Sequence, residues 1–267
     1  MAKGTKRASP GAETEKNPIP EPELGEEDAA KLDQIAKDIR RAELILERRA
    51  QATLTPVYEK RREVLKGIPR FWAVALMNHR LIEMHAQHHT DKLALSYLED
   101  LWIVRDKDEP KVFTIEFYFK ENPFFSDAVL KKVYKFVPSN AAADEKPDAD
   151  GLTPSMEDFS WERDVAIEPS TINWKDDSKN LQKLYPQVLD EDDIADPGSF
   201  FNFFAGTKDQ AELGVIIANE VFPDAIDFFT GRMDDDLTDD EDDSDDDDED
   251  AEEIDLEKPR AKKAKQA

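Results

Sequence analysis

The side chains of this chain that could carry chemistry are mostly carboxylates, and they are concentrated in one segment. Between Asp234 and Glu257, 18 of 24 residues are Asp or Glu. The segment has too few apolar residues to build a core, so we expect a solvated, self-repelling polyanion without fixed structure. Carboxylates at this density define no catalytic geometry. They indicate electrostatic capture of a strongly basic partner.

Two further patterns resemble metal sites. Four histidines lie close together in the sequence, with spacings that would place imidazoles on one helix face: His79, His85, His88 and His89. The chain contains no cysteine and few carboxylates lie near these histidines, so surface or partly buried histidines are favoured over a metal site. Asp148, Asp150 and Glu157 match part of a calcium-binding loop, but Lys146 stands where the first ligand is required. We predict no metal and no cofactor.

Catalytic motifs are not found. The nine glycines are scattered singly, so they form neither a dinucleotide fingerprint nor a phosphate-binding loop. The Gly-x-Ser-x-Gly pattern of a nucleophile elbow does not occur. We therefore expect a binding protein rather than an enzyme.

The charge is acidic along the whole chain and not only in the polyanionic segment. The net charge is −26, of which the acidic run contributes −18 and the last ten residues +5, leaving −13 on the remaining 233 residues. Direct nucleic-acid binding is disfavoured, because phosphate contacts require clustered Lys and Arg. A basic polypeptide such as a histone fits better, since opposite fields speed encounter and suppress wrong partners.

Residues 28–66 have the composition of a long helix, and this helix carries an apolar stripe. The residues of the stripe recur alternately every three and four positions, as in the seam of a coiled coil: Leu32, Ile35, Ile39, Ala42 and Leu46. The helix would be roughly 57 Å long, too long to hide its stripe against a small domain. The sequence offers no second helix of this length, so we predict a homodimer over a long core helix of a monomer. Pro56 predicts a kink or short break.

Residues 67–231 read as one α+β domain. Four segments alternate aromatic or β-branched residues with polar ones, near residues 98–104, 112–119, 133–137 and 165–167, which predicts a four-stranded antiparallel sheet. Apolar helical segments before and after the strands predict helices over one face. An Ala-, Asp- and Pro-rich stretch at 139–158 predicts a flexible insert.

The two ends of the chain are polar. Residues 1–27 are expected to be disordered, and 232–257 form the acidic tail. Residues 258–267 contain a basic cluster typical of a nuclear import signal, formed by Lys258, Arg260, Lys262, Lys263 and Lys265. No segment is long and apolar enough to span a bilayer, and the first residues do not form a signal peptide. We expect a soluble nuclear protein, with shuttling to the cytoplasm possible, that does not bind membranes.

Several segments, in register over about residues 28–230, resemble the nucleosome assembly protein (NAP) family. They are Thr55-Pro56-Val57-Tyr58-Glu59, Ile68-Pro69-Arg70-Phe71-Trp72, Glu121-Asn122-Pro123-Phe124-Phe125, Ile172-Asn173-Trp174-Lys175 and Ser199-Phe200-Phe201-Asn202-Phe203-Phe204. The Phe71-Trp72 pair and the compact helical end look most like the SET branch, which includes a fungal chaperone that accompanies a histone acetyltransferase.

The resemblance implies a histone chaperone that promotes nucleosome assembly. It implies a homodimer with paired long helices and an α+β "earmuff" domain at each end, whose underside binds core histones, either H3–H4 or H2A–H2B. Two sets of residues are therefore predicted to bind histones. The positions that match the underside of the family's domain are Asp209, Glu212, Glu220, Asp224 and Asp227, and the tail adds Asp234, Asp235, Asp236, Asp239, Asp240, Glu241, Asp242 and Asp243. Thr238 and Ser244, each followed by acids, are candidate phosphorylation sites.

Two alternatives remain open at this point. One is an acidic regulator or scaffold that modulates another enzyme, which would require binding that survives deletion of the tail and is indifferent to histones. The other is an acetyltransferase cofactor that presents histone to a catalytic partner. A stable complex with that enzyme in the absence of histone would favour the second alternative.

Overall fold

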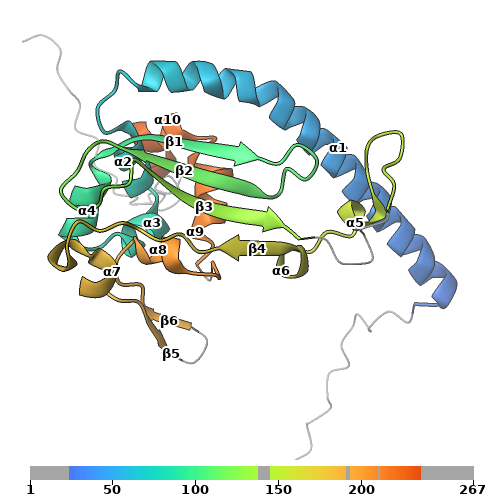
Figure 1. Ribbon diagram of the computed structural model, residues 1–267. Coiled ribbons are helices and arrows are strands. Elements are labelled where there is room, and N and C mark those ends of the chain that lie inside the picture. Colours follow the sequence, from blue (N-terminus) through green and yellow to red (C-terminus); the bar gives the residue numbers. More distant parts are fainter. Residues whose placement is uncertain (1–23, 138–144, 191–192, 210, 236–267) are drawn as a thin grey trace, which may run out of the picture.

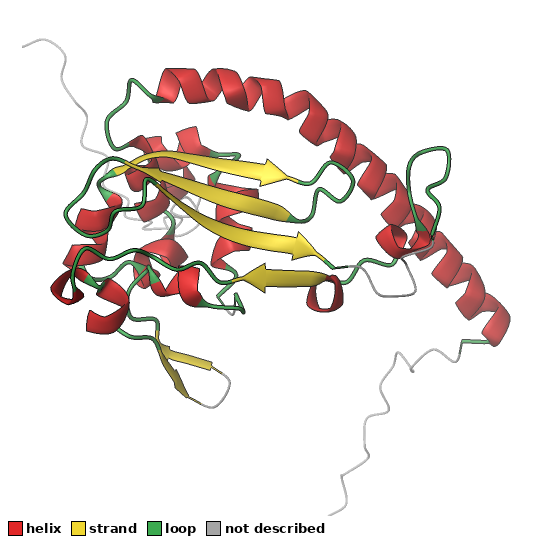
Figure 2. Cartoon of the chain, viewed as in Figure 1, coloured by secondary structure: helices red, strands yellow, loops and turns green. Residues whose placement is uncertain are grey.

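The computed structural model describes residues 24–137, 145–190, 193–209 and 211–235. One long helix, α1 (Glu26–Leu65), passes beside a four-stranded antiparallel sheet, and short helices cover one face of that sheet (Figures 1 and 2). The predicted α+β fold with its long helix is confirmed. The acidic tail, from Asp236 onward, and the segment 1–23 lie outside the described residues.

The sheet is a meander of β1 (Leu98–Arg105), β2 (Phe113–Phe119), β3 (Val129–Phe136) and β4 (Val165–Glu168), paired in that order. Its strands follow the alternation expected for a sheet with one buried face. In β2, Phe113, Ile115 and Phe117 are buried, whereas the residues between them are partly exposed. The four strands therefore lie where the sequence placed them, within a few residues.

The helices that cover the inner face come from both sides of the sheet in the sequence. Before it lie α2 (Phe71–Met77), α3 (Arg80–His85) and α4 (His89–Leu95); after it lie α8 (Asn202–Ala205), α9 (Leu213–Ile216), the π-helical turn η3 (Ile217–Val221) and α10 (Ala225–Thr230). Aromatic rings fill the interface. Phe117 of β2 meets Phe204 edge-on at 5.2 Å, and Trp72 of α2 stacks on Phe222 at 5.7 Å.

The remaining elements are short. They are α5 (Pro154–Glu157), α6 (Trp161–Asp164), the 3-10 turn η2 (Asp177–Lys179), α7 (Leu181–Leu184), the hairpin strands β5 (Val188–Asp190) and β6 (Asp193–Asp196), and α11 (Arg232–Asp235). The β5–β6 hairpin was not expected from the sequence. Its strands contain three and four residues, too few to show a clear alternation.

Helix α1 continues through Pro56 without the expected short break, and Figure 1 shows it as one curved helix. The C-terminal part of the helix is anchored to the domain through its last turns. Tyr58 meets the Phe222 ring edge-on at 5.1 Å, Arg61 donates to the Pro223 carbonyl at 2.8 Å, and Arg62 pairs with Asp100 of β1. These contacts fix the helix after the proline, so the loss of one backbone donor bends it rather than ending it.

The N-terminal half of α1 is attached to residues 145–158, part of the stretch expected to be a flexible insert. Arg41 binds the carboxylates of Asp148, Asp150 and Glu157 together, which raises the pKa of its guanidinium. Leu44 is fully buried in the same region. The three acids that resemble a calcium loop therefore hold an arginine of α1, while residues 138–144 of the insert lie outside the described part of the chain.

The turn between β1 and β2 buries a carboxylate. Glu109 is 1% exposed, neither of its carboxylate oxygens has a hydrogen-bond partner among the described residues, and the Lys111 ammonium lies 3.8 Å away. Burial raises the pKa of Glu109, because the apolar surroundings disfavour its charged form. At neutral pH this side chain therefore costs the folded state free energy.

We expect Glu109→Met to stabilise the protein at pH 7 by about 1 kcal/mol, because it removes an unsatisfied buried charge. The gain in stability of the variant shrinks as the pH falls, first through the raised pKa of Glu109 in the folded protein and then through the ordinary pKa of glutamate. Below both pKa values, wild-type Glu109 is neutral in the folded and in the unfolded state, so no charge remains to be relieved. Urea unfolding at pH 7 and at pH 4 measures the difference. Glu121→Met, at an exposed position, is the control. Equal stability of wild type and Glu109→Met at both pH values would contradict this account.

Candidate functional site

The candidate site is the outer side of the segment from α9 to α10, which presents carboxylates to solvent. Leu213, Ile217, Val221 and Phe222 of this segment point into the core. The surface positions next to these buried residues carry Glu212, Glu220 and Asp224, and all three are exposed. The segment is fixed by its buried face, so these acids are held on a rigid support.

Glu212 and Asp224 have no hydrogen bond or ion pair to their side chains within the described ranges. Glu212 occupies a left-handed backbone position (φ 54°) just before α9, and Asp224 precedes α10 without capping it. The Glu220 carboxylate lies 3.4 Å from Nε2 of His79, whose ring packs against Phe228. These three carboxylates are therefore accessible to a basic partner.

Asp209 and Asp227, predicted in the same set, have internal partners. Asp209 accepts the Tyr134 hydroxyl and the backbone N–H groups of Leu213 and Gly214 at 2.5, 2.9 and 2.8 Å, so it anchors the start of α9 to β3. Asp227 accepts hydrogen bonds from Arg232. Both carboxylates, which were predicted to contact histones, thus form hydrogen bonds within the chain that stabilise this surface.

A buried lysine of β3, which was not predicted from the sequence, also holds the loop before α9. Lys132 of β3 is fully buried; its ammonium donates to the Gly206 carbonyl and lies 5.3 Å from the Phe203 ring centre. Burial lowers the pKa of Lys132 to about 8, an effect that Asp209 partly offsets. The signal was available in the alternation of β3, where Leu130, Lys132 and Tyr134 share the inward side.

The polyanionic segment begins close to this surface. The chain continues from α10 into α11, and the backbone of Asp234 and Asp235 forms the end of that helix. The other predicted histone contacts of the tail lie outside the described residues: Asp236, Asp239, Asp240, Glu241, Asp242 and Asp243. The candidate phosphorylation sites Thr238 and Ser244 also lie outside them, as does the basic cluster of Lys258, Arg260, Lys262, Lys263 and Lys265.

The apolar stripe of α1 is exposed in the single chain. Leu32, Ile35, Ile39 and Leu46 are each more than half exposed, and Ala42 is also on the surface. At 100° per residue, Ala50, Val57 and Val64 continue the same side of the helix to its C-terminal end. The domain therefore covers only the opposite side of α1 and leaves this stripe free.

The four histidines are separated by the fold. His79 faces Glu220, the His88 ring stacks on Tyr185 at 3.9 Å, and His85 is buried, which lowers its pKa. Within the described ranges no group of three or more His, Asp or Glu side chains is arranged to hold a metal ion. None of the described helices combines the length and apolar character needed to cross a bilayer.

Comparisons with known proteins agree with the fold. The sequence model of the nucleosome assembly protein (NAP) family matches residues 59–232. The chain is 29% identical over 198 residues to nucleosome assembly protein 1;2 of Oryza sativa subsp. indica, covering 68% of this chain and 51% of that protein. It is 28% identical over 219 residues to NAP1-related protein 1 of Arabidopsis thaliana, covering 79% and 75%.

Solved structures with a similar fold include Ccp1 and Vps75. For Ccp1 the TM-score is 0.59 at 24% identity, covering 78% of this chain and 96% of that one. For Vps75 it is 0.54 at 15% identity, covering 78% and 98%. At these identities the likeness concerns the fold alone.

The family match extends over well more than half of the sequence, from the last turns of α1 to α11, so this chain belongs to the nucleosome assembly protein family. The chain spans about half the length of the first curated relatives that it matches. Membership of the SET branch remains a prediction.

We expect Gly214→Ala to destabilise the protein by about 2 kcal/mol or more, because the added methyl group would overlap the hydroxyl and ring of Tyr134. The overlap would displace Tyr134 from Asp209 and disturb the start of α9. Gly25→Ala is the matched control, since its added methyl meets no atom within 4 Å. Thermal unfolding at one protein concentration compares them; equal midpoints would show that α9 is not tied to β3 in this way.

Proposed function

We propose that this chain is a histone chaperone that binds core histones and promotes nucleosome assembly. The observation that carries the proposal is the pair of exposed carboxylates, Glu212 and Asp224, on a rigid surface that leads into a polyanionic segment. Within the described residues, neither side chain forms a hydrogen bond or a close ion pair. Its relatives in Oryza sativa and Xenopus laevis are named nucleosome assembly proteins, which supports the proposal. Histones are the basic class of protein that such a surface complements.

The proposed mechanism is competitive shielding. Histone surfaces that would otherwise collapse onto DNA are covered by the carboxylates of the α9–α10 surface and by the acidic tail. The tail adds local concentration without imposing a fixed geometry, so it speeds capture while allowing the histone to be handed over. The proposal is of a binding protein and assigns no catalytic residue.

We further propose that the protein is a homodimer joined through the stripe of α1. An apolar stripe on a 40-residue helix, exposed along its length, is unfavourable in water. A two-fold pair buries both stripes at once and places one acidic surface at each end of the rod. The basic cluster at residues 258–265 supports a nuclear location. A histone acetyltransferase partner stays a prediction that no observation here favours over histone binding alone.

We expect the triple variant Glu212→Gln, Glu220→Gln, Asp224→Asn to weaken binding of H3–H4 by about tenfold, which corresponds to three exposed charge contacts worth about 0.5 kcal/mol each. The matched control, Glu121→Gln, Glu162→Gln, Asp190→Asn, removes the same charge from exposed positions elsewhere. Fluorescence titration at fixed salt measures both.

Comparing the triple variant with its control in a chain that ends at Met233 separates the contribution of the α9–α10 surface to binding from that of the tail. The triple variant should still bind more weakly than its control there. If the two triple variants bind alike in both chain lengths, net charge and not the α9–α10 surface determines binding, and the proposed site is wrong.

We expect Ile39→Asp with Leu46→Asp to convert the dimer into a monomer of 30.5 kDa, because two pairs of charges would be buried in the helix contact. Ala30→Asp, an exposed position on the opposite side of α1, should leave the dimer intact. Light scattering during size-exclusion chromatography gives the mass. A wild-type chain that is monomeric at micromolar concentration would contradict the dimer.

A further inference from the structure

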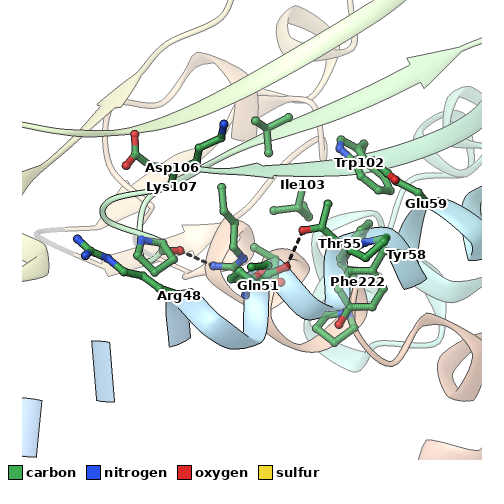
Figure 3. A pocket seen from close by; sticks show the side chains of 17 residues that line it. Arg48, Gln51, Thr55, Tyr58, Glu59, Trp102, Ile103, Asp106, Lys107 and Phe222 are labelled. Carbon is green, nitrogen blue, oxygen red and sulfur yellow. Dashed lines mark hydrogen bonds between the residues drawn. The ribbon is translucent and has the colours of Figure 1, made fainter. Parts of the chain in front are cut away.

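A groove of about 620 Å³ lies between α1 and β1, on the side of α1 opposite the exposed stripe. Figure 3 shows side chains of both elements facing each other across it. The groove exists because α1 turns small side chains toward β1, namely Ala52, Thr55 and Pro56. Its volume falls within the roughly 300–1,000 Å³ typical of ligand pockets.

The wall formed by β1 is an open strand edge. Asp106 donates to the Val112 carbonyl at 3.2 Å, so in this antiparallel pair the residues bonded to β2 are Val104 and Trp102, in steps of two. The N–H and C=O groups of Ile103 and Arg105 therefore point away from β2, toward α1. No backbone bond to them is found in the described part of the chain. An extended segment placed in the groove would satisfy these groups as an added strand.

The floor and rim of the groove define the chemistry of that segment. The floor is apolar, formed by Ala218, Phe222 and Pro223. Five charged residues line the rim, three of them basic: Arg48, Arg105, Lys107, Glu59 and Asp106.

The basic residues at the groove form their hydrogen bonds mainly to carbonyl groups, with carboxylates of the described ranges nearby but not hydrogen-bonded to them. Glu47 acts electrostatically on Arg105, and Arg48 does so on Glu109. Among the described residues, Arg105 donates to the Pro110 and Ala218 carbonyls and the Asn219 amide oxygen, and Arg48 donates to backbone carbonyls and the Met156 sulfur. Arg61, beside Phe222, donates to the Pro223 carbonyl, and Asp224 is near enough to act on its charge. One of the two acids, Asp106, already accepts the N–H groups of Asp108 and Glu109. In a chain of net charge −26, a groove whose rim holds three basic and two acidic residues favours an acidic, partly apolar strand over a basic one.

We propose that the groove binds residues 252–257 of the same chain, Glu-Glu-Ile-Asp-Leu-Glu. This is the one place in the acidic segment where two large apolar residues, Ile254 and Leu256, are two positions apart and so share one side of a strand. Those side chains face the apolar floor, while the flanking acids face the basic rim. The 16 residues between Asp235 and Glu252 span up to about 55 Å when extended, and Pro223, twelve residues before Asp235, lines the groove.

A histone segment fits this groove less well than the tail does, because its lysines and arginines would meet a rim with more basic than acidic residues, Arg48, Arg105 and Lys107 against Glu59 and Asp106. The proposal does not depend on histone binding elsewhere on the chain. It assigns the tail two parts: a docked strand near its end and a free polyanion before it.

The chain contains no cysteine, so Ala251→Cys in the full chain accepts a single nitroxide spin label. Biosynthetic fluorotryptophan places fluorine on all four tryptophans, of which Trp102 lines the groove and Trp174 packs against Phe125 and Phe201 elsewhere. We expect the Trp102 resonance to lose most of its intensity to the label, and the Trp174 resonance to keep it.

The matched variants test the apolar contact and the basic rim separately. Ile254→Ser with Leu256→Ser should restore the Trp102 signal, whereas Leu237→Ser, which removes an apolar residue from the same tail, should not. Ala52→Phe, which fills the groove from an exposed position of α1, should also restore it. Trp102 signal retained in the labelled wild type, or broadening that persists after Ile254→Ser with Leu256→Ser, would overturn the proposal.

Two further outcomes name other occupants. Spin-labelled chains are mixed with separate fluorotryptophan chains and allowed to exchange subunits, and Trp102 stays sharp if the tail binds its own chain. Broadening in this mixture as well would assign the groove to the tail of a second copy and overturn the same-chain proposal. A basic histone-tail peptide that shifts Trp102 as strongly in the wild type as in Ile254→Ser with Leu256→Ser would show that the groove is not occupied by the tail.

Discussion

The constraint on which this structure depends is that α1 is longer than the domain beside it, so its two sides meet different surroundings. One side is held by its own chain, through Arg41 and the residue 148–157 acids at one end and Tyr58, Arg61 and Arg62 at the other. The other side carries the exposed apolar stripe. Fixing the first side determines the direction in which the second side faces. The geometry of any dimer is therefore set by contacts within each chain.

The same constraint creates the groove. Helix α1 must cross the open edge of β1 to reach both attachment regions, and covering a sheet edge with a helix protects it from pairing with other chains. A helix cannot supply hydrogen bonds to that edge, because its own backbone groups are already paired. Small residues on α1 then leave the edge accessible instead of sealing it. Charge is divided in a corresponding way. Carboxylates face solvent on the α9–α10 surface, whereas Arg48, Arg105 and Lys107 line the rim of the groove.

Much of this architecture follows from patterns with a clear physical period. The four strands were predicted because their buried side chains alternate, and the long helix because its apolar residues recur every three and four positions. The candidate surface was predicted only in part. Sequence position alone could not distinguish Asp209, which anchors α9, from Glu212, whose side chain forms no bond among the described residues. That difference depends on the Tyr134 hydroxyl, 75 residues from Asp209 in the sequence. The contact between Arg41 and the 148–157 acids is equally remote in sequence, and so was missed.

The two proposed parts of the tail would respond differently to salt, and this follows from the forces involved. The free polyanion acts at long range on exposed charges, and at 1 M salt the screening length falls to about 3 Å. The docked strand relies on two buried apolar side chains and on backbone hydrogen bonds, which salt screens little. High salt should therefore release histone from the polyanion before it releases residues 252–257 from the groove. A tail that left the groove at the same salt concentration would be held there by charge alone, and the open edge of β1 would then be only a surface that α1 protects.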